Sequence, residues 1–130
     1  MIENKELLFR INMLEQYMKN IYQQIEAVEN ECAELDSLKK GLEDLKDSSG
    51  KEVFSSVGKN IFIKTKIISE ELLVGIGEKN LVTKSIPETA KIIENQIKKL
   101  ESIREELLRE IEKLNKEAEK IVNSIENSPN

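Results

Sequence analysis

The sequence has no histidine, no tryptophan and a single cysteine in 130 residues. Without histidine, neither a histidine-based catalytic triad nor a zinc site of the usual histidine and cysteine ligands can form. The one cysteine, Cys32, cannot make a disulfide within the chain. These absences exclude much of enzyme chemistry, and the sequence predicts no catalytic residue, no metal site and no cofactor.

Aromatic residues are also scarce, at 4% of the chain, whereas 35% of the residues are charged. This composition favours long solvated helices over a compact globular core. The net charge of −5 is spread along the chain and shows no basic patch, so nucleic acid is not an expected partner.

Long apolar runs are absent as well. No run approaches the roughly 20 residues that span a bilayer, and the first ten residues lack the basic and apolar regions of a signal peptide. We therefore expect a cytoplasmic protein that does not bind membranes.

Apolar residues recur every seven positions in the first third of the chain, which is the pattern of a coiled-coil seam. One set is Leu7, Leu14, Ile21, Val28, Leu35 and Leu42, and the other is Ile11, Met18, Ile25 and Cys32. The second set becomes polar at Lys39 and Lys46, where Leu38 and Leu45 are expected to take over. The pattern predicts a helix over about residues 7–46, with Cys32 as a buried small side chain.

The same pattern returns from Ile86 to Ile125 and is interrupted at Arg104. Ser85 and Glu88 have the S-x-x-E spacing of a capping box, and Pro87 falls in the first turn, where its missing N–H has no helical partner to lose. A second helix is predicted over residues 86–126, followed by a disordered tail at 127–130.

Each helical segment is about 40 residues, or about 60 Å at 1.5 Å per residue. Equal lengths allow the two seams to match as an antiparallel coiled coil, with both termini at one tip. The expected fold is mainly α, a single domain in which residues 1–46 and 86–126 form a long coiled-coil hairpin and residues 47–85 form a small β region at the bend.

Residues 47–85 change to a period of two, the period of a β-strand. Strands are predicted at about 53–57, 60–68, 71–76 and 80–85, forming two β-hairpins. The apolar residues assigned to these strands, and to oligomerisation through them, are Val53, Val57, Ile61, Ile63, Ile67, Leu72, Val74, Ile76 and Leu81.

Two Gly-containing segments, SVGKNIFIK and GIGEKNLVTK, mark the turns of these hairpins. Gly58, Asn60, Gly77 and Asn80 are the turn residues expected from them, because Gly and Asn tolerate positive φ. A nucleotide-binding loop is the alternative. It would need a third glycine or a Gly-Lys-Ser/Thr sequence and a following helix, which are both missing here.

Two hairpins of this size are not stable alone in water and leave unpaired strand edges. The sequence therefore predicts an oligomer in which strands of several chains close into a shared sheet or barrel.

The order VFSSVGKNIFIKTKI, ELLVGIGEKNLVTKS and IPETAKIIENQIKKL, flanked by heptad helices of equal length, resembles the alpha-type subunit of prefoldin over almost the whole chain. One departure is Ser56, where many alpha-type members have proline. The resemblance implies a hexamer of two alpha-type and four beta-type subunits, whose hairpins form an intersubunit double β-barrel. It further implies an ATP-independent holdase that captures unfolded polypeptides at its coiled-coil tips and delivers them to a group II chaperonin.

Client-binding tips should expose more apolar side chains than the seam needs. The candidates near the two helix ends are Ile2, Leu8, Phe9, Met13, Val122 and Ile125. Alternatively, several of these residues merely flank a broad two-helix seam. The rival function is a structural coiled-coil scaffold, in which the hairpins associate in an open arrangement and build filaments.

Overall fold

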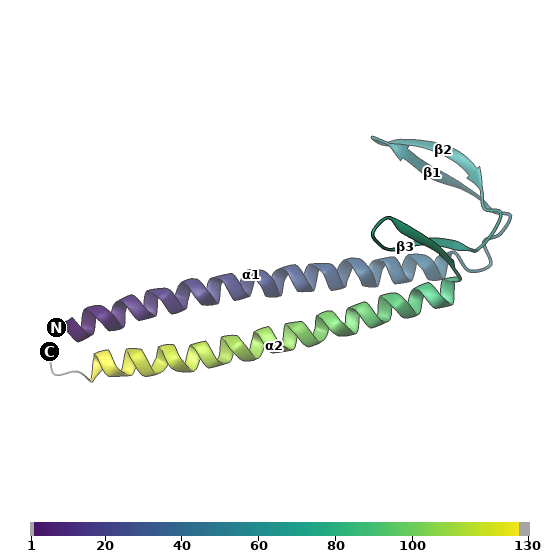
Figure 1. Cartoon of the computed structure of the whole chain (residues 1–130). Helices are drawn as coiled ribbons and strands as arrows, with labels where there is room; N and C mark the ends of the chain where they lie inside the picture. The colour runs from purple at the N-terminus through teal and green to yellow at the C-terminus, as the bar shows by residue number, and fades with distance from the viewer. Residues whose placement is uncertain (1, 128–130) are drawn as a thin grey trace. The chain divides into compact units, whose positions relative to one another are not determined.

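The computed structural model describes residues 2–127, and the side chains of residues 4–127. The element order is α1 (Ile2–Asp44), β1 (Glu52–Gly58), β2 (Ile61–Lys66), β3 (Leu72–Gly77), β4 (Asn80–Lys84) and α2 (Ile86–Glu126) (Figure 1). Two compact units are present, a helix-pair unit of residues 1–33 and 98–130 and a hairpin unit of residues 34–97. The prediction of two long helices with two β-hairpins between them is confirmed.

The core of the helix-pair unit is a line of isoleucines from both helices. Ile21 and Ile25 of α1 and Ile111 of α2 are each at most 6% exposed, and Met18, Leu107 and Leu114 pack against them. The two segments run antiparallel, because an early residue of α1, Arg10, pairs with Glu117, whereas the later Glu29 pairs with Arg104. All six apolar residues belong to the heptad positions of the sequence.

In the core of the hairpin unit, the end of α1 packs against the start of α2. Leu42, Ile86 and Ile93 are buried there, and Leu35, Leu45, Leu72 and Ile97 pack against them. Burying such branched side chains contributes about 1.5–3 kcal/mol each, so this cluster stabilises the packing of the two helix ends to which the hairpins are connected.

One expectation about the seam is wrong. Leu38 does not replace Lys39 in the seam, because Leu38 is 52% exposed while Lys39 is half-buried. Lys39 is accommodated at its seam position because its ammonium lies 2.8 Å from the Glu94 carboxylate of the facing helix. Arg104, the other charged residue at a seam position, also pairs with the facing helix: its Nε lies 3.5 Å from a carboxylate oxygen of Glu29.

α2 begins at the predicted cap. The backbone N–H of Glu88 donates to the Ser85 hydroxyl oxygen at 3.2 Å, and that hydroxyl donates to the Glu88 carboxylate at 3.0 Å. Thr89 adds two bonds to the Ser85 carbonyl, from its N–H at 3.0 Å and its hydroxyl at 2.8 Å. The N–H of Glu88 has no carbonyl acceptor within the helix, so the Ser85 hydroxyl supplies its partner, and the Thr89 N–H makes the first bond of the helix to the Ser85 carbonyl; together these bonds fix where the strand ends and the helix starts.

Both hairpins are antiparallel and have the same turn. β1 and β2 pair from Glu52 opposite Lys66 to Gly58 opposite Ile61, with a bulge before Gly58. β3 and β4 pair from Leu72 opposite Lys84 to Gly77 opposite Asn80, with a bulge before Gly77. The similarity of the two sequence segments therefore reflects one repeated turn geometry.

The loop residues of both turns lie at positive φ. Lys59 and Asn60 have φ of 46° and 64°, and Glu78 and Lys79 have φ of 47° and 64°, which fits two-residue hairpin loops that match strand twist. Asn80 is the first residue of β4 and only flanks its loop, unlike Asn60. The two segments align structurally at their glycines, so Lys79 is the counterpart of Asn60.

Candidate functional site

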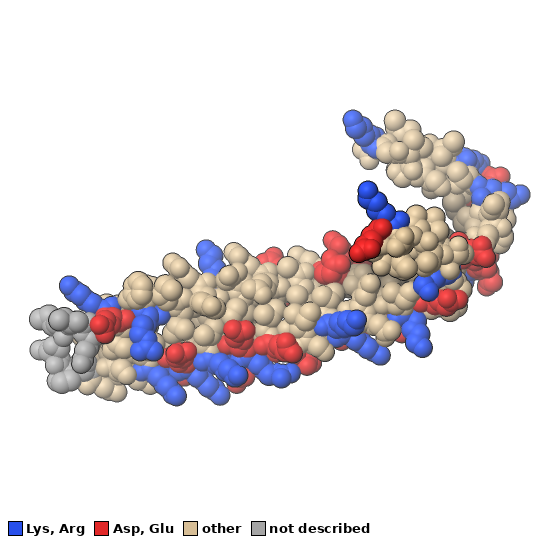
Figure 2. Space-filling model, viewed as in Figure 1, with Lys and Arg blue, Asp and Glu red and all other residues tan. Residues whose placement is uncertain are grey.

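The hairpins present apolar side chains to solvent. Val53, Val57, Ile61, Ile63, Ile76 and Leu81, all assigned to strands from the sequence, are between 37% and 66% exposed. In Figure 2 the strands of the hairpin unit are mostly uncharged, with charged groups gathered at their ends. Each hairpin is a separate two-stranded sheet, so each strand has one edge without a strand partner among the described residues. Exposed apolar faces and open edges are features of a surface that another chain covers.

The other three apolar residues assigned to the strands, Ile67, Leu72 and Val74, are half-buried. Leu72 packs against the buried cluster of the hairpin unit, and Val74 is half-buried on the same face of β3. Because side chains alternate along a strand, the neighbour Leu73 faces outward and is 68% exposed. Ile67 follows β2, although its N–H and C=O continue the pairing with Lys51 and Gly50.

Sequence reasoning missed a second apolar face on the first hairpin. Phe54 and Phe62 are 71% and 57% exposed on the face opposite Val53 and Ile63. Ile68, in the connection to β3, is 89% exposed. The signal was available, because a strand with apolar residues at both odd and even positions is apolar on both faces. This hairpin therefore offers two surfaces for burial.

The predicted tip residues lie on the helix-pair unit. Leu8, Phe9, Met13 and Val122 are 53%, 64%, 47% and 40% exposed, while Ile125 is half-buried. The side chain of Ile2 lies outside the described residues. Phe9 and Met13 are one turn apart and share a face of α1 with Tyr17, which is 61% exposed and extends the apolar stripe beyond the predicted set.

Exposed apolar residues also occur away from these helix ends. Tyr22, Ile103 and Leu108 are 51%, 45% and 39% exposed within the same unit. Exposure alone therefore does not distinguish Phe9 and Met13 from these residues. What distinguishes them is that they form, with Tyr17, a continuous stripe along one face of α1.

Cys32 has the surroundings of an unreactive thiol. Burial raises the pKa of Cys32 above its ordinary value of 9.0, and the carboxylates of Glu101 and Glu31 raise it further, whereas Arg104 opposes them. That arginine is already 3.5 Å from Glu29. The thiol is therefore held in its protonated form, which is a poor nucleophile.

The described part of the chain contains neither a metal-binding cluster nor a membrane-spanning helix. Among the described residues, no group of three or more Cys, Asp or Glu side chains is arranged to hold a metal ion. Neither helix, over its described length, is long and apolar enough to cross a membrane. Gly77 lies in a hairpin turn that leads into β4 and not into a helix, so the phosphate-binding alternative fails on geometry.

Two long antiparallel helices connected through two β-hairpins define a class of coiled-coil proteins with an inserted strand region. The sequence model of the prefoldin family, described as prefoldin subunit, matches residues 14–128. The chain belongs to the prefoldin family, a family of chaperone subunits.

Its relatives point to the alpha type. Prefoldin subunit alpha of Methanosphaera stadtmanae is 29% identical over 90 residues, which is 69% of this chain and 65% of that protein. Prefoldin subunit alpha of Methanobrevibacter smithii is 36% identical over 104 residues, or 79% of this chain and 71% of the other. The similarity thus extends over about two thirds of these relatives' length.

Among solved structures, the fold is similar to a chain in the cryo-EM structure of filamentous PFD from Methanocaldococcus jannaschii. The TM-score is 0.54 at 24% sequence identity, covering 94% of this chain and 97% of the other. That likeness supports the arrangement of helices and hairpins.

Proposed function

We propose that this chain is the alpha-type subunit of a cytoplasmic, ATP-independent holdase that binds unfolded polypeptides and passes them to a group II chaperonin. It performs no catalysis in this role. Membership of the prefoldin family and the alpha-type relatives support the assignment. The observation that carries the binding step is the exposed stripe of Phe9 and Met13, at 64% and 47% exposure.

In this proposal the hairpins assemble the complex. Two alpha-type and four beta-type subunits would share strands in a double β-barrel, which would cover apolar residues such as Ile61, Ile63 and Leu81. Burying apolar surface that a free chain exposes would drive the association, at about 25 cal/mol per Å². The second apolar face, with Phe54 and Phe62, would be covered in the same assembly.

Client capture would depend on the helix ends. Methionine and aromatic side chains adapt to many apolar partners, and several copies engaging one client would add up weak contacts. This mode needs no nucleotide, since binding and release follow from affinity alone.

The test is aggregation of a denatured client, followed by light scattering, with the chain and a beta-type subunit present. We expect Phe9→Ser with Met13→Ser to weaken suppression of aggregation while the mass of the complex stays unchanged. Leu38→Ser, which removes a similarly exposed apolar side chain of α1 in the hairpin unit, is the matched control and should leave suppression intact.

Assembly is tested on the hairpin. Ile63→Lys should reduce the mass of the mixture, because a charge would be placed on a face that the complex buries. Long open polymers that do not protect the client would instead favour the scaffold function. Undiminished protection by the Phe9→Ser and Met13→Ser double variant would show that the client is captured elsewhere.

A further inference from the structure

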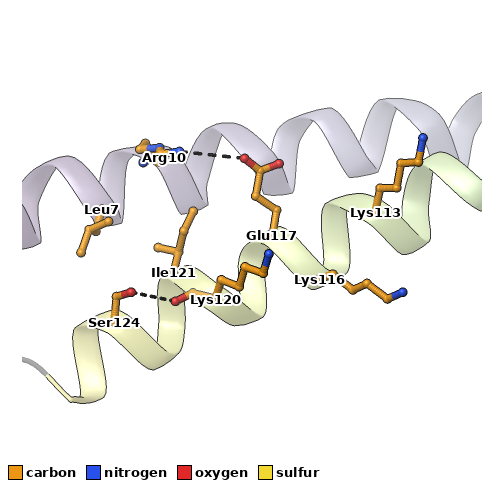
Figure 3. A pocket seen from close by; sticks show the side chains of 8 residues that line it. All are labelled: Leu7, Arg10, Lys113, Lys116, Glu117, Lys120, Ile121 and Ser124. Atoms are coloured by element: carbon orange, nitrogen blue, oxygen red, sulfur yellow. Dashed lines mark hydrogen bonds and ion pairs between the residues drawn. The ribbon is translucent and has the colours of Figure 1, made fainter.

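A groove of about 570 Å³ lies between α1 and α2 in the helix-pair unit (Figure 3). Its charged lining consists of four cations, Arg10, Lys113, Lys116 and Lys120, and one carboxylate, Glu117. The lining is therefore net positive although the whole chain carries a charge of −5. The expectation that charge is evenly spread fails here, because folding brings Arg10 beside a lysine-rich stretch of α2.

These cations are weakly neutralised. The Arg10 guanidinium lies 3.9 Å from Glu117, and the Lys116 ammonium lies 3.9 Å from Glu112, with all four side chains at least half exposed. Such exposed, distant pairs contribute little. Lys113 and Lys120 form no ion pair with any residue that the structure describes. Their full charge is thus available to a ligand.

The base of the groove is apolar. Ile121 is 5% exposed and Leu7 is half-buried, and both line the groove beneath the charged groups. An anion alone would use only the rim, whereas a ligand with both carboxylates and an apolar group would match rim and floor together. A polypeptide segment supplies both kinds of group from neighbouring residues.

We propose that this groove binds a short acidic segment of a partner polypeptide, with one apolar side chain against Leu7 and Ile121 and flanking carboxylates at the lysines. Lys113 and Lys120 are seven residues apart, or about 10.5 Å along the helix at 1.5 Å per residue. An extended peptide covers that distance in about three residues at roughly 3.3 Å each. Two or three acidic residues close together in sequence are therefore enough.

The surroundings favour a short segment over a long polyanion. α2 carries Glu110 and Glu112 just before Lys113, and α1 carries Glu6 one turn before Arg10. A nucleic acid that continued past the groove would meet these like charges, whereas a short peptide would avoid them. Phe9 and Met13 do not line the groove, so this site is separate from the proposed client surface.

The experiment measures fluorescence anisotropy of a rhodamine-labelled peptide, several Asp and Glu residues around a central leucine, titrated with the full chain. We expect saturable binding that weakens as salt is added, and a loss of about three- to tenfold in affinity for Lys113→Gln with Lys120→Gln. Lys98→Gln with Lys99→Gln is the matched control, since it removes the same charge from exposed positions of α2 outside the groove.

The control variant should bind as the wild type does, and the peptide with Asn and Gln in place of its acids should not bind. Equal losses in both double variants would overturn the proposal, because attraction would then be general and not local. Tighter binding of a single-stranded oligonucleotide or of anionic vesicles than of the peptide would overturn it as well, by assigning the surface to another class of ligand.

Discussion

The Lys39 ammonium lies 2.8 Å from the Glu94 carboxylate, so a lysine occupies a heptad position and bonds across to the facing helix. The hydrogen bond to Glu94 raises the pKa of Lys39 above its ordinary value of 10.5, against the opposing effect of desolvation. A raised pKa in the folded state means that this contribution to stability is complete below 10.5 and is lost as pH rises through the folded-state pKa.

Replacing Lys39 by methionine should therefore change how stability depends on pH. The urea midpoint of wild type should fall more steeply above pH 10.5 than that of Lys39→Met, because only wild type loses the Glu94 pair. Lys40→Met is the control, since Lys40 pairs with Asp36 on its own helix and is 76% exposed. Identical alkaline slopes for wild type and Lys39→Met would contradict the expected coupling.

The cap at Ser85 gives a second prediction. Ser85→Ala removes the acceptor of the Glu88 N–H and should lower the free energy of unfolding by about 1 kcal/mol. Ser85→Asn keeps a capping oxygen and should lose much less. Thermal unfolding followed by circular dichroism measures both, and similar losses in the two variants would show that the cap is not the cause.

Glycine to alanine substitutions should have opposite effects at two positions. Gly41 lies inside α1, and a Cβ there would meet no atom within 4 Å, so Gly41→Ala should stabilise the helix by about 0.5–1 kcal/mol. Gly77 has φ of 114°, so Gly77→Ala should destabilise the second hairpin by about 1–3 kcal/mol. Urea unfolding reports the first change, and hydrogen exchange of the β3 and β4 amides reports the second.

Cys32 should react slowly with iodoacetamide. Because burial raises the pKa of its thiol, the rate should reach half its maximum above pH 9.0 in the folded chain and near 9.0 in urea. Glu101→Gln should move the folded midpoint downward, since this carboxylate is the largest charge that raises the pKa. A folded midpoint below 9.0 would mean that Arg104 dominates the thiol's surroundings.

Local patterns alone predicted the helices, the cap and the turns. The seven-residue repeat, the Ser85 to Glu88 spacing and the Gly-containing turns act over a few residues, so their structural meaning does not depend on distant parts of the chain. Strand positions were also found, with ends that differ from the structure by at most two residues. Asn80 is the exception among the predicted turn residues. Both segments contain Lys-Asn, but the second has one more residue between its glycine and this pair, so Asn80 falls in β4 when the turns are aligned at their glycines.

The fold decided which side chains are covered. Alternation along β3 shows that Leu72 and Leu73 face opposite ways, but only packing against the Leu42 cluster determines that Leu72 is the inner one. In the same way, Leu38 was expected in the seam from hydrophobicity, whereas Lys39 occupies that position because Glu94 accepts its ammonium.

What the sequence determined by itself is the set of elements and their order, since periodicity, capping and turn chemistry are properties of neighbouring residues. The basic groove, by contrast, exists only because antiparallel pairing places Arg10 beside residues more than one hundred positions later. Net charge and composition are sums over the chain and carry no information on such neighbours. Tertiary structure alone could therefore convert an acidic chain into one with a local cationic site.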